Sequence, residues 1–91
     1  MSSEVPSTVH GANPDVLWRV VGKEALLLDT TSGNYFSLNP VATAIWVRMT
    51  SGESPDQISE GIAATYSISV ERARDDIHEL ITEMKDAGIW R

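Results

Sequence analysis

The chain has 91 residues, of which 42% are hydrophobic, so it can form one small domain with a single core but has little room for a buried cofactor or a deep active site. It contains no cysteine, which excludes disulfides, thiolate metal sites and a cysteine nucleophile, and fits a reducing cytoplasm. Seven basic and thirteen acidic residues give a net charge of −6, which disfavours binding to nucleic acid and favours neutral or basic partners.

Residues 1–15 contain Ser, Pro, Thr, Gly and Asn without an apolar period, so we expect a flexible N-terminal segment there and one domain over residues 16–91. The segment lacks the basic and then apolar pattern of a secretory signal. No stretch of the chain approaches the roughly 20 apolar residues of a membrane span. We therefore expect a cytoplasmic protein without a membrane partner.

Three strands in a meander are predicted next. Residues 16–21 can form a strand whose side chains alternate between two faces, with Val16, Trp18 and Val20 on one of them. Gly22-Lys23 turns the chain into a second strand at residues 26–29. Residues 30–34 are turn formers, including a glycine and an asparagine that readily take positive φ, and they lead into a third strand at 35–38. Because a helix start follows this strand at once, we expect it to be an edge strand.

Three helices are predicted after the strands, each with a capping residue at its start. Asn39 caps the first helix and Pro40 begins it, and the helix extends to about Met49 before Gly52 ends it. The helical period turns Val41, Ala44 and Ile45 inward, together with Met49 or Val47, and places Trp46 near the edge of that face.

The second and third helices both begin at serines. Ser54 starts a capping box with Gln57, and the buried stripe of this second helix is Ile58, Ile62, Ala63 and Tyr66. Ser69 caps the third and longest helix, and Gly88 ends it. The apolar residues of the third helix are Val70, Ala73, Ile77, Leu80, Ile81 and Met84.

Three strands followed by three helices predict an α+β fold, similar to a winged helix-turn-helix with its sheet placed first. Winged helices most often bind DNA, but residues 70–87 carry three basic residues against six acidic ones. Phosphates would repel a helix of that charge. A winged-helix regulator that binds DNA or another protein is therefore kept as the alternative function.

No constellation of residues indicates an enzyme, a cofactor or a metal site. His10 falls in the N-terminal segment and His78 on a helix surface, where solvated side chains are more common than metal ligands. The third helix carries a run of carboxylates at Asp75, Asp76, Glu79 and Glu83. Such a run is usually the solvated face of an amphipathic helix. We therefore predict a non-catalytic protein.

An ordered set of short motifs gives the chain a family resemblance. The segments are LLLDTTSGNYFSLNPVATAIW, then Gly52, then IAATYSISVERARDDI and a terminal GIW. The set resembles the PqqD-like family, small leader-peptide recognition domains of ribosomal peptide biosynthesis, over about residues 16–91. Within that family, the chain is most similar to the stand-alone leader-binding proteins of split-type lasso peptide pathways.

The resemblance implies that a precursor's leader peptide adds as a further strand beside the third strand, in the groove next to the third helix. The protein would then present the leader to a separate leader peptidase and a cyclase. The implied peptide-binding residues are Tyr35, Phe36, Ser37 and Leu38 on the strand and Ala73, Asp76, Ile77, Leu80 and Glu83 on the helix. In this arrangement Asp76 and Glu83 would meet a basic leader residue. Four of these residues are more typical of a core than of a ligand contact alone, although residues at the margin of a core can be both, namely Phe36, Leu38, Ile77 and Leu80.

Overall fold

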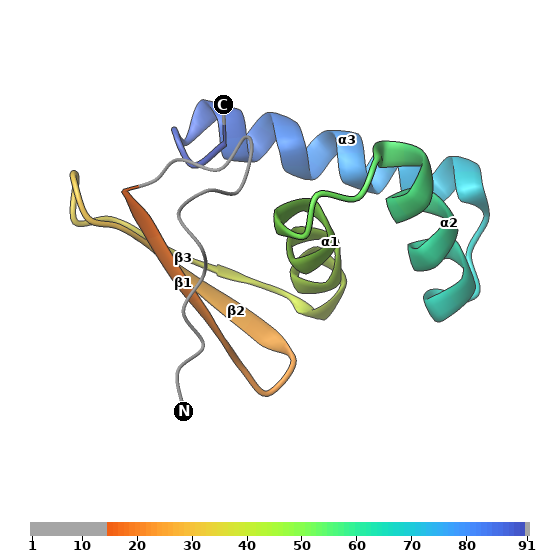
Figure 1. Ribbon diagram of the computed structural model, residues 1–91, viewed down its shortest axis with the longest axis horizontal. Coiled ribbons are helices and arrows are strands. Elements are labelled where there is room, and N and C mark those ends of the chain that lie inside the picture. Colours follow the sequence, from red (N-terminus) through yellow and green to blue (C-terminus); the bar gives the residue numbers. More distant parts are fainter. Residues whose placement is uncertain (1–14, 91) are drawn as a thin grey trace.

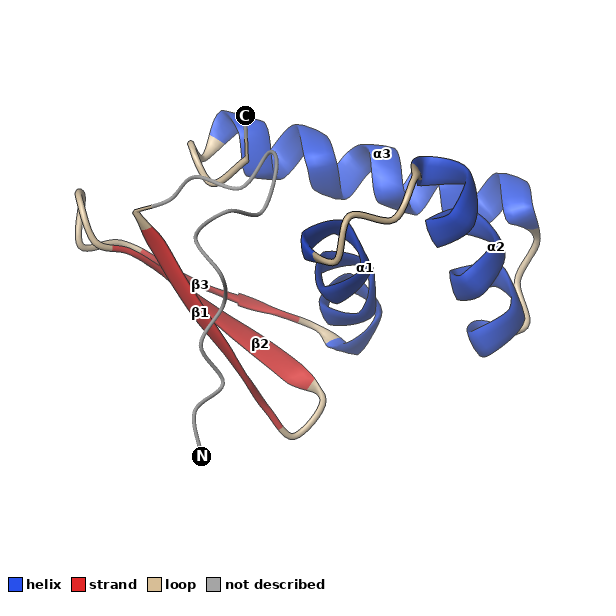
Figure 2. Ribbon diagram, in the orientation of Figure 1, coloured by secondary structure: helices blue, strands red, loops and turns tan. Residues whose placement is uncertain are grey.

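Three strands and three helices follow one another along residues 15–90, the part of the chain that the computed structural model describes (Figures 1 and 2). Except for Asp15, the segment expected to be flexible lies outside the described residues, as does His10. The strands are β1 (Val16–Val21), β2 (Glu24–Asp29) and β3 (Tyr35–Leu38), and the helices are α1 (Pro40–Thr50), α2 (Pro55–Tyr66) and α3 (Val70–Asp86). The predicted α+β order, with the sheet first, is confirmed.

The strands form an antiparallel sheet in the order β1-β2-β3, so β2 is central. Residues opposite one another form rows across the sheet, such as Leu17, Leu28 and Tyr35. Side chains alternate between the two faces of a sheet. This row therefore faces solvent, whereas Ala25 and Leu27 on the other face of β2 are fully buried.

Local signals in the sequence set the helix ends. The side chains of Asn39, Ser54 and Ser69 each accept a hydrogen bond from the backbone N–H three residues later, as the capping pattern predicts. Gly52 and Gly88 follow α1 and α3 with positive φ angles of 88° and 77°. The residue after each glycine donates its N–H to the carbonyl five positions before it, which closes a Schellman motif.

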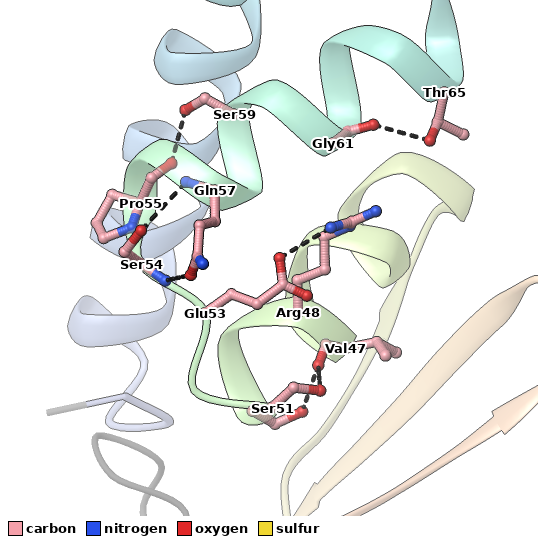
Figure 3. A network of polar contacts seen from close by, with 11 residues as sticks. Val47, Arg48, Ser51, Glu53, Ser54, Pro55, Gln57, Ser59, Gly61 and Thr65 are labelled. Carbon is pink, nitrogen blue, oxygen red and sulfur yellow. Dashed lines mark hydrogen bonds and ion pairs between the residues drawn. The ribbon is translucent and has the colours of Figure 1, made fainter.

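Arg48 holds the junction between α1 and α2 (Figure 3). Its Nη1 lies 2.8 Å from Oε1 of Glu53, and its guanidinium lies against Gly61 of α2, where a Cβ atom would collide with it. In the capping box that starts α2, Ser54 Oγ accepts the N–H of Gln57, and Gln57 Oε1 accepts the N–H of Ser54. Any side chain at Gly61 would displace the guanidinium from this position.

A cluster of three tryptophans lies in the core. Trp46 is completely buried and meets Trp18 and Trp90 edge to face, with ring centroids 5.9 and 5.8 Å away. The expectation that Trp46 lies near the edge of the inward face of α1 is therefore wrong. The reason is that α1 packs against two strands and both other helices, so it buries more than one stripe. The sequence left open whether Met49 or Val47 faces inward. Met49 is 5% exposed and Val47 is 38% exposed, so Met49 is the core residue.

Thr43 of α1 joins the helix to the end of the β2–β3 ladder. Its Oγ1 accepts a hydrogen bond from the N–H of Ala25 at 2.8 Å and donates one to the carbonyl of Leu38 at 3.1 Å. Because Thr43 is buried, the Ala25 N–H would have no partner without this hydroxyl. The hydroxyl thus fixes the point at which β3 ends and α1 begins.

Thr43→Val should lower the free energy of unfolding by about 1–3 kcal/mol, because this nearly isosteric change leaves a buried N–H unpaired. Thr50→Val is the matched control. The Thr50 hydroxyl donates only to the carbonyl of Val47, which also accepts the N–H of Ser51, so its loss should cost less. Urea unfolding followed by circular dichroism measures both changes. Equal losses in the two variants would contradict the bridging role of Thr43.

Candidate functional site

Within residues 15–90, no further strand pairs with the outer side of β3 (Figure 2). The β2–β3 turn determines which backbone groups face that side. Gly33, with a φ of 79°, donates its N–H to the carbonyl of Asp29, and Asp29 donates its own N–H to the carbonyl of Asn34, both at 2.8 Å. This is the hydrogen-bond pattern of a G1 bulge, and it makes Asp29 and Asn34 a hydrogen-bonded pair.

Hydrogen-bonded and non-hydrogen-bonded pairs alternate along an antiparallel ladder. Counting along the register from the turn, the pair that includes Phe36 is hydrogen-bonded, and the pairs that include Tyr35 and Ser37 are not. Tyr35 and Ser37 therefore direct their N–H and C=O groups toward the outer side of β3. Two donors and two acceptors on that side are available to another extended segment.

A cavity of about 290 Å³ opens directly after β3, between the start of α1 and the middle of α3. Its lining consists of Asn39, Val41, Ala42 and Ile45 from the α1 side and Asp76, Glu79, Leu80 and Glu83 from α3. Residues three and four apart lie on one face of a helix, which is how each helix brings its set to the opening. Because Asn39 follows the last residue of β3, the cavity adjoins the end of that strand. We call the outer side of β3 and this cavity together the edge groove.

The lining of the cavity divides into an apolar and an acidic part. Val41, Ala42, Ile45 and Leu80 provide the apolar part, and the acidic part consists of Asp76, Glu79 and Glu83. In the described part of the chain, the ion pairs are Arg48–Glu53 and Arg74–Asp56, so none of these three carboxylates has one. Their three negative charges, close together, make the opening a region of negative potential.

Residues 15–90 contain no group of three or more His, Cys, Asp or Glu side chains placed to hold a metal ion. None of their helices has the length and apolar character needed to cross a membrane. His78 is exposed on α3.

Residues 24–89, more than half of the chain, match the model of a family described as coenzyme PQQ synthesis protein D (PqqD). The chain belongs to the PqqD family. The resemblance inferred from the sequence motifs is thereby confirmed. No curated protein matches the chain.

Two solved structures share the fold of this PqqD-family protein. A structure of TbiB1 in complex with the TbiA(beta) leader peptide superposes with a TM-score of 0.84 at 23% sequence identity, covering 89% of this chain and 94% of the other. A lasso peptide synthetase B1 complexed with its leader peptide gives a TM-score of 0.82 at 29% identity, covering 88% and 94%. Both confirm the arrangement of three strands followed by three helices.

The edge groove of this PqqD-family protein contains most of the site residues predicted from its sequence. Tyr35–Leu38 form the strand edge, and Asp76, Leu80 and Glu83 line the cavity. Ala73 and Ile77 are at most 3% exposed and do not line the cavity, so they support α3 from the core side. Contact of these residues with a peptide stays a prediction.

Sequence reasoning missed the α1 side of the cavity. The sequence predicts Asn39 as a cap, Val41 and Ile45 as inward-facing residues and Glu79 as part of a solvated face, and all four also line the opening. A signal was available in Asn39-Pro40. It starts α1 immediately after β3, and this brings the first turns of the helix to the end of the edge strand.

The solvent face of the sheet is a second candidate surface of this PqqD-family protein. We call it the outer sheet face, and its exposed apolar residues are Leu17, Val21, Leu26, Leu28 and Tyr35. They extend across all three strands, and a hollow of about 240 Å³ lies among the residues of β2 and Tyr35. Contiguous apolar surface left exposed on a small domain marks a site of interaction.

Proposed function

We propose that this protein is a non-catalytic recognition protein that captures the leader of a ribosomal precursor peptide, in the manner of lasso peptide pathways. The observation that carries the proposal is the open edge of β3 next to a cavity on α3. The two solved structures with the same fold are both complexes with leader peptides, which supports the assignment.

In the proposed complex, the leader adds as a fourth strand at Tyr35–Leu38. The N–H and C=O groups of Tyr35 and Ser37 pair with the leader backbone. These hydrogen bonds provide affinity that does not depend on the leader's sequence. Alternate leader side chains then point toward the helix side, where the cavity lies. These side chains provide the specificity.

We further propose that the bound leader is presented to a separate leader peptidase and then to a cyclase. The outer sheet face is the surface we assign to docking of the peptidase, because it is apolar, exposed and directed away from the cavity. Holding leader and peptidase on one small protein converts their encounter into a reaction at an effective concentration on the order of mM. No chemistry by this protein itself is needed for that effect.

The alternative of a winged-helix regulator has less support. Arg74, one of the three basic residues of α3, pairs with Asp56, and the cavity beside α3 is acidic. A phosphate backbone would be repelled at this face. Binding to DNA would weaken steeply with salt, whereas main-chain pairing of a leader with β3 would depend on salt much less.

The proposed function predicts that this protein speeds cleavage of a precursor peptide by a separate leader peptidase, and leaves the precursor unchanged when it acts alone. A cleavage time course with saturating leader binding measures the effect. Equal rates with and without the protein would refute presentation, and cleavage without the peptidase would refute the non-catalytic role.

A variant of the outer sheet face separates leader capture from presentation. Leu17 is 61% exposed, so Leu17→Glu should leave the fold within about 0.5 kcal/mol of the parent. We expect this variant to bind the leader normally and to lose most of the rate enhancement. Thr82→Glu, on an exposed position of α3 outside the cavity lining, adds the same charge elsewhere and should keep the enhancement.

A further inference from the structure

The cavity beside β3 has a composition that restricts what can fill it. Its apolar part, formed by Val41, Ile45 and Leu80 together with Ala42, would pack against a hydrocarbon chain. Its acidic part lies on one face of α3, and within the described residues none of its three carboxylates forms an ion pair. One occupant must therefore satisfy both parts.

Neither an apolar nor an acidic side chain suits both parts of the cavity. An apolar side chain covers the apolar part but brings three carboxylates closer to a low-dielectric group, which raises the cost of their charges. An acidic side chain adds repulsion. Lysine and arginine carry a long hydrocarbon stem and a cationic head, so the stem can lie on the apolar part while the head reaches the carboxylates.

The position of the cavity also fixes where such a residue lies in the peptide. Asn39 belongs to the cavity lining and follows Leu38, the last residue of β3. We therefore expect a strand that pairs with β3 and continues past Leu38 to reach the cavity. The residue that fills the cavity therefore lies at, or immediately beyond, the end of the paired segment that adjoins Leu38.

We infer that the peptide recognised by this protein carries a lysine or arginine at one fixed position, held in the cavity by Asp76, Glu79 and Glu83. This inference rests on the proposed function and names the chemistry of its ligand. The three carboxylates make the protein select for a basic residue and against an acidic one at that position. Because Glu79 and Glu83 are exposed and Asp76 is half-buried, each ion pair contributes only a modest factor, and losing all three carboxylates should weaken binding about fivefold.

The test uses a display library of short random peptides, selected separately on three forms of the protein. The first is the parent chain. The second has a neutral cavity, with Asp76→Asn, Glu79→Gln and Glu83→Gln. The third is a control that removes the same number of charges at exposed positions outside the cavity, with Glu60→Gln, Asp75→Asn and Asp86→Asn. Circular dichroism verifies that all three forms are folded.

We expect peptides selected on the parent and on the control to share a lysine or arginine at one fixed position, and peptides selected on the neutral-cavity form to lack it. Enriched peptides that bind the parent without a fixed basic residue would overturn this inference and leave leader capture intact. A fixed basic residue that persists on the neutral-cavity form would also overturn it. If no peptide is enriched on the parent, the proposed function itself fails.

Discussion

Trp46→Ala should lower the free energy of unfolding by about 3–5 kcal/mol, a large part of the roughly 5–15 kcal/mol that holds a small domain together. Trp46 is completely buried in α1 and touches the rings of Trp18 and Trp90. Truncation therefore removes buried apolar surface and both edge-to-face contacts, and it leaves a cavity at the place where α1 meets the other elements. In a chain of this size, each kcal/mol shifts the midpoint of thermal unfolding by about 4–8 °C.

Thermal and urea unfolding followed by far-UV circular dichroism measure this loss without depending on tryptophan fluorescence. Tyr35→Ala is the control, because Tyr35 is also aromatic but 75% exposed, and it should change stability by less than about 0.5 kcal/mol. A Trp46→Ala variant as stable as Tyr35→Ala would mean that the tryptophan cluster does not organise the core.

The sequence predicted the order of elements well because most of the signals are local. Asn39, Ser54 and Ser69 act as caps, and Gly52 and Gly88 as helix ends, through contacts that span only a few residues. Such contacts can be read from spacing alone. The α+β fold and its helix boundaries follow from them.

The sequence failed where burial depends on several partners. A helical period predicts one buried stripe, and Trp46 lies outside the stripe that Val41 and Ile45 define. In the folded chain α1 touches β2, β3, α2 and α3, so its burial extends well around the helix. Thr43 was missed for the same reason, since its hydroxyl is needed only where the end of the β2–β3 ladder meets the helix.

The candidate site was predicted only in part, because the α3 side of the cavity has a recognisable sequence pattern and the α1 side does not. Asp76, Leu80 and Glu83 share a face of one long amphipathic helix, and that face is visible in the sequence. Val41 and Ile45 are more than thirty positions away and look like ordinary core residues. Only the packing of α1 against α3 brings the two sets around one cavity.

Ser37→Pro should abolish leader binding while the protein stays folded. The ladder alternation directs the N–H of Ser37 to the outer side of β3, so proline removes a donor that the sheet itself does not use. The pyrrolidine ring also occupies the space into which a fourth strand must come. Proline is tolerated on edge strands in this setting, and Phe36 before it already has the extended conformation that a following proline requires. Titration calorimetry with the leader peptide gives the affinity, and circular dichroism gives the fold.

Ser37→Ala keeps the backbone N–H and removes only an exposed hydroxyl, so it should bind the leader as the parent does. The same main-chain pairing can be tested on the peptide, with a series of leader peptides that each carry one N-methylated residue, while the protein stays unchanged. Because strand pairing uses every second residue, methylation should block binding at alternate leader positions and be tolerated between them. A folded Ser37→Pro variant with normal affinity, or methylated leaders without this alternation, would show that the leader does not add to β3.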